Sequence, residues 1–138
     1  MFAKITPFFL LTIIHKINAM NVEQLAKIND YNQFCMVESH VNPEQIEAVK
    51  RNNFNDDDVK LRQHGYCFAK KLNFIDGRGN LQIDLIRSKL YEQLSSSKTE
   101  ADELIAKCAT IKATPEETAY HLLKCLHINV PRGTVYVR

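Results

Sequence analysis

The sequence predicts an all-α domain, and three observations lead to this prediction. Apolar residues recur at i, i+3, i+4 and i+7 in several segments, which is the spacing of one helix face. Helix start signals, in which a capping side chain precedes proline, occur at Asn42-Pro43 and Thr114-Pro115. Strand-like alternation is convincing only in the tail Thr134–Val137. We therefore expect six short amphipathic helices in succession.

The first nineteen residues have the layout of a secretory signal peptide. Lys4 gives a positive start, a short apolar core runs from Phe8 to Ile14, and Ala19 is the small residue after which cleavage is expected. This core is far shorter than the roughly 20 residues of a membrane-spanning helix, so a membrane anchor is the less favoured interpretation. We expect a signal peptide over 1–19 and a secreted, extracellular protein without membrane insertion, with one helical domain over 20–138.

Removal of the signal peptide changes the charge of the chain. The whole sequence has 18 basic and 16 acidic residues, which gives a formal net charge of +2. Lys4 and Lys16 leave with the signal peptide, so 16 basic residues balance 16 acidic ones in the mature chain. A neutral domain lacks the basic surface of a nucleic-acid-binding protein, and no nucleic-acid partner is expected.

Three helices are expected before the first glycine-containing turn. The first has a long apolar stripe, and the second has a short one formed by Ile46 and Val49. The third opens with acidic residues, which are favourable at the positive end of a helix dipole. The expected ranges are 20–39, from 42 to a break at 53–55, and from 55–58 to about 72.

The segment from Asp76 to Asn80 is expected to be a turn, because Gly and Asn suit left-handed backbone conformations. A calcium loop of the EF-hand type is excluded, since alternating acidic ligands and a bidentate glutamate are missing. The histidines and cysteines also lack the spacing of a zinc site. We therefore expect no metal and no cofactor.

Three further helices are expected after this turn. The fourth carries Ile86 and Leu90 on one side, and the polar joint 95–97 separates it from the fifth, which Thr99 is expected to cap. The sixth begins after Thr114, because a proline and a glutamate follow this capping residue. The expected ranges are 80–94, from 99 to 108, and from 114 to about 128.

The sequence has four cysteines, an even number that predicts two disulfides in a small secreted domain. Three connectivities are possible, and spacing alone does not choose among them. Cys108 and Cys125 lie on the expected fifth and sixth helices, where a disulfide would clamp a helical hairpin and contribute ~3 kcal/mol. Two unpaired buried thiols are the alternative there. The other two cysteines are Cys35 and Cys67.

Motifs that carry catalysis are missing from the sequence. It has no HExxH, no GxSxG and no phosphate-binding glycine loop. Ser95–Ser97 has no base placed near it in a recognised pattern and is interpreted as a joint. The protein is therefore not expected to be an enzyme. Its surplus apolar helix faces could fill a solid core or enclose a cavity, and periodicity does not distinguish the two.

The cysteine spacing and its flanking residues resemble the insect odorant-binding proteins, which include pheromone and general odorant-binding proteins. In that family of six cysteines, three residues separate the second from the third and eight separate the fifth from the sixth. The segments HGYCFAKKLNFIDGRGNLQID and EETAYHLLKCL are similar to the family's third-helix and last-helix segments. The four cysteines match the first, third, fourth and sixth, as in the four-cysteine minus-C branch. Gln63 and Glu116 occupy the two vacated positions.

This resemblance implies a fold and a function. It implies disulfides Cys35–Cys67 and Cys108–Cys125, and six helices around an apolar cavity that carries small hydrophobic molecules such as odorants and pheromones through aqueous fluid. The absent bridge would have joined the third and sixth helices, so the third is expected to move more freely. A membrane chemoreceptor is a further candidate partner. The alternatives are a secreted helical signalling or structural protein with a solid core, and a carrier of a non-olfactory hydrophobic cargo.

Eight positions are candidates for the cavity lining, chosen from the helix faces, although each could belong to an ordinary core. Tyr136 lies in the tail, which we expect to fold across the cavity mouth unless it frays as chain ends commonly do. His121 and His127 precede this tail and are expected to become charged on acidification toward about pH 5, which would loosen it. The candidates are Phe68, Leu72, Ile86, Leu90, Ile105, Tyr120, Leu123 and Tyr136.

Overall fold

The computed structural model describes residues 22–94 and 98–130, and within this part it confirms the all-α prediction. The expected signal peptide, the joint 95–97 and the expected tail lid with Tyr136 lie outside the described residues. No strand is present in the described ranges, where Ile75 and Leu81 form an isolated antiparallel bridge. The helices are α2 (Val22–Ser39), α3 (Pro43–Lys50), α4 (Val59–Lys71), α5 (Ile83–Leu94), α6 (Lys98–Cys108) and α7 (Pro115–Asn129).

Capping side chains begin three helices, and two of these starts, at Asn42 and Thr114, were predicted from the sequence. Asn42, Asp58 and Thr114 each have extended backbone, and their side-chain oxygens accept hydrogen bonds from backbone N–H groups two or three residues further on, at 2.9 to 3.1 Å. These bonds satisfy donors that the first turn of a helix leaves free. The prediction of Thr99 as a cap is wrong by position, because α6 begins at Lys98 and Thr99 lies inside its first turn.

The turn between α4 and α5 is longer than the sequence predicted. The Asp76 carboxylate accepts hydrogen bonds from the backbone N–H groups of Arg78 and Asn80, both at 2.9 Å. Asn80 is therefore held in the turn, and α5 begins at Ile83 instead. Gly79 has a φ of +89°, and a Cβ there would lie 2.6 Å from the Pro115 ring. This glycine allows the turn to pack against the start of α7.

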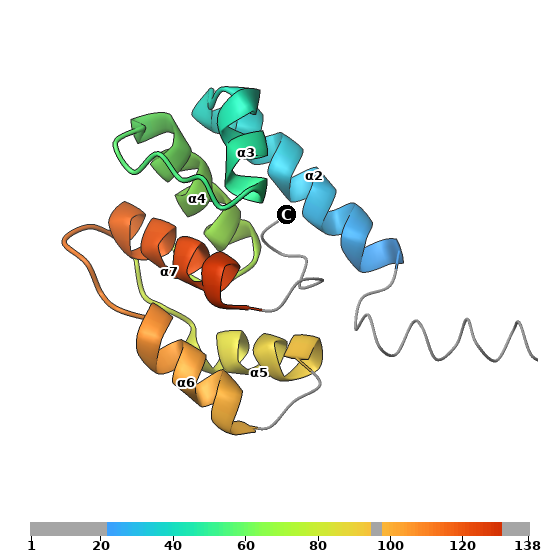
Figure 1. The fold of residues 1–138 in the computed structure, drawn as a ribbon, viewed down its shortest axis with the longest axis vertical. Helices are drawn as coiled ribbons and strands as arrows, with labels where there is room; N and C mark the ends of the chain where they lie inside the picture. Colours follow the sequence, from blue (N-terminus) through green and yellow to red (C-terminus); the bar gives the residue numbers. More distant parts are fainter. Residues whose placement is uncertain (1–21, 95–97, 131–138) are drawn as a thin grey trace, which may run out of the picture.

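The helices pack in an order that differs from their order in the chain. α4 lies between α2 and α7, α6 packs on the other side of α7, and α5 packs against α6 (Figure 1). Cys35–Cys67 joins α2 to α4, and Cys108–Cys125 joins α6 to α7. These are the two pairs that the family resemblance implies. None of the described helices is long and apolar enough to cross a membrane.

Buried apolar side chains form two clusters, and α7 contributes residues to both. The larger one, here called the packed core, includes residues that are at most 1% exposed, such as Ile86, Leu90, Leu122 and Leu126. The smaller one, here called the small cluster, consists of Val41, Ile46, Leu61 and Tyr120, with Met36, Val49 and Phe54 packed against it.

Candidate ligand pocket

An apolar pocket of about 70 Å³ lies beside the small cluster. Its walls come from α2, α3, α4, α7 and the segment that joins α3 to α4. The fold of this segment follows from the sequence, because two short helices with caps at Asn42 and Asp58 leave an irregular stretch between them. The lining residues are Asn32, Ile46, Val49, Lys50, Phe54, Leu61, His64, Gly65, Phe68, Tyr120, Leu123, Lys124 and His127.

The structure divides the eight sequence-predicted positions into two groups. Phe68, Tyr120 and Leu123 lie together in the wall of the apolar pocket, where Phe68 and Leu123 also belong to the packed core. The other described positions do not line it. Ile86, Leu90 and Ile105 are buried in the packed core, and Leu72 packs against that core. Tyr136 lies outside the described residues.

Several lining residues were not among the predicted positions. Ile46 and Val49 form the short apolar face that the sequence does show for α3, but a helix face by itself does not reveal what it packs against. Leu61 and His64 lie on α4 at i and i+3, a spacing that places both side chains on one face of the helix. This spacing was the sequence signal that could have identified them. Phe54 lies in a break between helices, where periodicity carries no information.

Phe54 closes one wall of the pocket from the α3–α4 segment. Its ring meets Tyr120 edge to face, with 6.3 Å between centroids, and meets His127 in the same way at 5.5 Å. The ammonium of Lys124 lies 5.7 Å from the Phe54 ring centroid, within the range of a cation–π interaction. The position of this wall therefore depends on contacts between a loop and α7.

Asp56 fastens the same segment to α7. Its carboxylate accepts a hydrogen bond from the Tyr120 hydroxyl at 2.7 Å and two from the Lys124 ammonium at 2.9 and 2.8 Å. The hydrogen bond from Lys124, and then that from Tyr120, lowers the pKa of Asp56 below its usual value. Burial, and then the bond to Asp56, raises the pKa of Tyr120. Tyr120 is thus a neutral donor and Asp56 an anionic acceptor at neutral pH.

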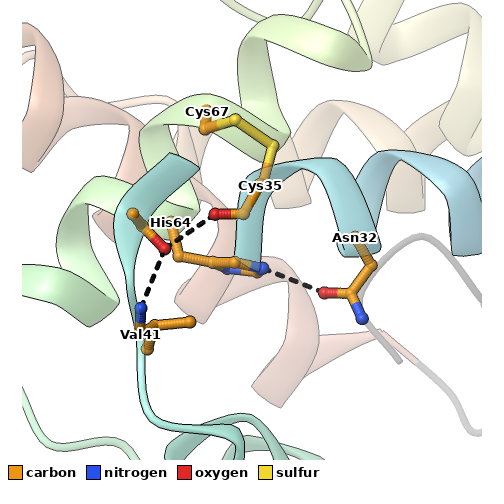
Figure 2. The surroundings of a disulfide bond; sticks show 6 residues. Asn32, Cys35, Val41, His64 and Cys67 are labelled. Carbon is orange, nitrogen blue, oxygen red and sulfur yellow. Dashed lines mark hydrogen bonds between the residues drawn. A yellow bond between two sulfur atoms is a disulfide. The ribbon is translucent and has the colours of Figure 1, made fainter. Parts of the chain in front are cut away.

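His64 lies deeper in the wall, beside the disulfide that joins α2 to α4 (Figure 2). Its Nε2 lies 2.9 Å from the Asn32 side-chain oxygen, and its ring stacks on Phe68 with 6.0 Å between centroids. Because an amide oxygen only accepts, we assign the proton to Nε2. Burial lowers the pKa of His64 to about 4, against a smaller opposing effect of its bond to Asn32. His64 is therefore neutral at neutral pH.

The chemistry of the pocket suits burial of an apolar molecule. The lining is dominated by aliphatic and aromatic side chains, and the polar groups of His64, Tyr120 and Lys124 bind other protein groups. In the ranges 22–94 and 98–130, no three side chains of His, Cys, Asp or Glu gather as a metal site would require. Such a pocket holds a ligand by removing apolar surface from water.

Comparisons with known proteins agree with this geometry. Residues 18–129 match the model of the PBP/GOBP family. The chain is 26% identical to the B1 protein of Tenebrio molitor over 129 residues, with 92% of this chain and 98% of that protein covered. It is 24% identical to odorant-binding protein 10 of Aedes aegypti over 135 residues, with 92% of each covered. The solved structure of the THP12 carrier protein from the yellow meal worm superimposes with a TM-score of 0.58 at 37% identity, covering 70% of this chain and 88% of that one.

Proposed function

This chain belongs to the PBP/GOBP family of small-ligand carriers, and on that premise we propose that it is a secreted carrier of small hydrophobic molecules, such as odorants or pheromones. The apolar pocket holds the molecule, and the protein transports it through aqueous fluid. No covalent bond is made or broken, so the protein acts as a carrier and not as an enzyme. A membrane chemoreceptor that receives the cargo is a further candidate partner.

The observation that carries this proposal is the apolar pocket between α3, α4 and α7. Burial of apolar surface contributes about 25 cal/mol per Å², so a ligand that buries roughly 200 Å² gains about 5 kcal/mol before the costs of binding. Phe68, Tyr120 and Leu123 are proposed to contact the ligand directly. A solid-core signalling protein is less well supported, because this space would then be filled.

The size of the pocket limits what it can hold. Its volume of about 70 Å³ is well below the roughly 300–1,000 Å³ of pockets for drug-sized ligands. Either the cargo is very small or the walls move apart when it enters. We propose that the walls move, and that the vacated disulfide positions permit it.

The two vacated positions lie on α4 and α7, which flank the pocket. Gln63 is exposed, and Glu116 forms an ion pair with Arg62 at 3.6 Å between Nε and Oε1. A partly exposed ion pair contributes only about 0–1 kcal/mol, whereas a disulfide would fix the two helices covalently. α4 and α7 are therefore expected to separate more readily than they would with a third bridge.

The proposal is tested by displacement of a fluorescent hydrophobic probe from the mature protein by small volatile compounds. The Val49→Trp variant places a large ring in the pocket wall and is expected to weaken probe binding at least tenfold, about 1.4 kcal/mol. The matched control is Val37→Trp on α2, because Val37 is 70% exposed and outside the pocket lining. Circular dichroism checks that both variants remain helical.

Two outcomes contradict the proposal. One is a probe that binds but that no volatile compound displaces from the wild-type protein. The other is an affinity of Val49→Trp equal to that of Val37→Trp. Carriage of a non-olfactory hydrophobic cargo uses the same pocket chemistry, and the tissue in which the protein is expressed separates that role from chemosensation.

A further inference from the structure

A second hollow, here called the polar depression, adjoins the apolar pocket. It is an open hollow of about 380 Å³. Tyr120 and Lys124 belong to the walls of both hollows, so the two meet at these side chains. The residues that line the polar depression are Asp56, Arg62, Lys112, Glu117, Tyr120, His121 and Lys124.

The boundary between the two hollows is occupied by a carboxylate of the protein itself. Asp56 accepts a hydrogen bond from the Tyr120 hydroxyl at 2.7 Å, and its second oxygen lies 2.8 Å from the Lys124 ammonium. A phenol and an ammonium that converge on one carboxylate form a strong, charge-assisted donor set. The same two donors can receive the carboxylate of another molecule in place of that of Asp56.

Other residues in the lining of the polar depression add positive charge to this donor set. Lys112 is exposed there and lines the depression together with His121. Burial lowers the pKa of His121, and the positive charges of Lys112 and then Lys124 lower it further. Lys112 and Lys124 therefore both act on His121 as positive charges, and Glu117 is the acidic side chain in the same wall. Arg62 contributes less, because it is paired with Glu116.

We propose that the preferred cargo is an amphiphile whose apolar chain fills the apolar pocket and whose carboxylate lies in the polar depression. This inference rests on the proposed carrier function and names the ligand class. The head group faces Lys112 and exchanges with Asp56 for the hydrogen bonds of Tyr120 and Lys124. The chain passes Phe54, which lies on the pocket side of this boundary.

The exchange is balanced in charge and in hydrogen bonds. One carboxylate replaces another on the same two donors, so no proton is transferred and no covalent bond changes. Asp56 is then released to solvent, where a carboxylate is well hydrated. An alkane of the same length gains only the apolar term, and an alcohol cannot offer an anionic acceptor to Lys112 and Lys124.

The test uses three molecules with the same ten-carbon chain, namely the carboxylate, its methyl ester and the alcohol, each displacing a fluorescent hydrophobic probe from the full mature chain at neutral pH. We expect the carboxylate to bind roughly threefold to tenfold more tightly than the alcohol, with the ester close to the alcohol. The measured quantity is the ratio of carboxylate to alcohol affinity. This ratio cancels any general change in the pocket.

Two variants move this ratio in opposite directions. Lys112→Gln removes a positive charge from the head-group site and is expected to lower the ratio roughly twofold to fivefold. Asp56→Asn removes the competing carboxylate and is expected to raise the ratio. The matched control is Lys89→Gln on α5, because Lys89 lines neither hollow and pairs with Glu92.

Each outcome distinguishes this inference from the carrier function on which it rests. If the alcohol and the carboxylate displace the probe equally well, the carboxylate site is overturned while the carrier function stands. If Lys112→Gln behaves as Lys89→Gln does, the placement of the head group beside Lys112 is wrong. If Asp56→Asn lowers the ratio, the exchange with Asp56 at Tyr120 and Lys124 is wrong. If none of the three molecules displaces the probe, the proposed carrier function itself fails.

Discussion

The two faces of α7 are held in different ways. Toward α5 and α6, here called the packed side, Leu122 and Leu126 are fully buried in the packed core, and the disulfide Cys108–Cys125 fixes α7 to α6. Toward α3 and the α3–α4 segment, here called the pocket side, α7 borders a cavity. There it is held by the Lys124–Asp56 ion pair and by aromatic contacts.

This difference indicates which part of the molecule can deform when a ligand enters. A disulfide and a close-packed core resist displacement, because a small shift loses many dispersion contacts at once. A partly exposed ion pair contributes only about 0–1 kcal/mol, and a ring at the edge of a cavity has fewer contacts to lose. One helix thus joins a rigid side to a side that can open, which is what a carrier with a narrow pocket requires.

The largest expected effect on stability comes from a leucine-to-alanine substitution, which is made once on the packed side and once on the pocket side. Leu90→Ala on the packed side removes a side chain that is 1% exposed and is expected to lower the free energy of unfolding by about 2–5 kcal/mol. Ligand affinity should remain unchanged, because Leu90 does not line the pocket. Urea unfolding and probe titration measure the two quantities.

The comparison is completed by Leu61→Ala on the pocket side. Leu61 borders the cavity, so its truncation is expected to change ligand affinity as well as stability. If Leu90→Ala weakens binding as much as Leu61→Ala does, the division of α7 into two sides is wrong.

A third bridge should make the pocket side resemble the packed side. Replacement of Gln63 and Glu116 by cysteine is expected to form a disulfide and to stabilise the fold by about 2–4 kcal/mol, less any strain. It should also weaken the binding of the larger ligands, since α4 and α7 can no longer separate. Peptide mapping under non-reducing conditions and thermal unfolding check both results.

The control for this bridge uses the neighbouring position. Arg62 already reaches Glu116 in the structure, so the pair Arg62→Cys and Glu116→Cys tests a different register of α4 against α7. Oxidation of the Arg62 pair but not of the Gln63 pair would show that the vacated family positions have moved apart in this chain.

The number of helices and the presence of two disulfides could be predicted from the sequence. Apolar spacing predicted six helices, and Asn42 and Thr114 predicted two of their starts, because these signals act over a few residues. The disulfide pairs came from the family resemblance instead. The prediction that a helix begins at Asn80 was wrong, because the carboxylate of Asp76, four residues earlier, holds Asn80 in a turn.

The pocket was harder to predict than the helices. Periodicity shows that Ile86 and Ile46 both face inward, but it does not show that one meets a packed core and the other a cavity. The bond between Asp56 and Lys124 joins residues 68 positions apart, so no local pattern reveals it. Phe54 lies in an irregular segment, and its role depends on the position of α7.

Acidification should lower the free energy of unfolding through His64, which lines the pocket. The pKa of His64 is lowered to about 4 in the folded protein, from 6.5 for an unperturbed histidine. The unfolded chain therefore binds a proton over this interval while the folded chain does not, so stability falls as the pH is lowered from 6.5 toward 4. The loss is on the order of 3 kcal/mol when the interval has been crossed.

The variant His64→Gln isolates this contribution. It keeps an N–H group for Asn32 but does not titrate, so its stability should fall less than that of the wild type between about pH 7 and pH 4.5. Urea unfolding at both pH values gives the difference. His40→Asn is the control, because His40 is exposed and lies outside the pocket lining. An acid dependence of His64→Gln identical to that of the wild type would remove His64 as the sensitive group.

The smallest expected effect comes from Gly65, which lines the pocket on α4. An added Cβ would lie 3.5 Å from Tyr120 Cδ1, 3.6 Å from Tyr120 Cα and 3.9 Å from Leu123 Cδ1, which are ordinary van der Waals distances. Gly65→Ala should therefore fit without strain and stabilise the helix by about 0.5–1 kcal/mol, because alanine loses less backbone entropy on folding. The methyl group also occupies space in the pocket wall, so bulky ligands should bind slightly more weakly while the smallest are unaffected.

Gly77→Ala is the matched control, since no atom lies within 4 Å of its added Cβ and it is outside the pocket lining. A loss of stability in Gly65→Ala would show that α4 and α7 are already in tight contact at this point, and the pocket side would then be less compliant than the pocket volume of about 70 Å³ indicates.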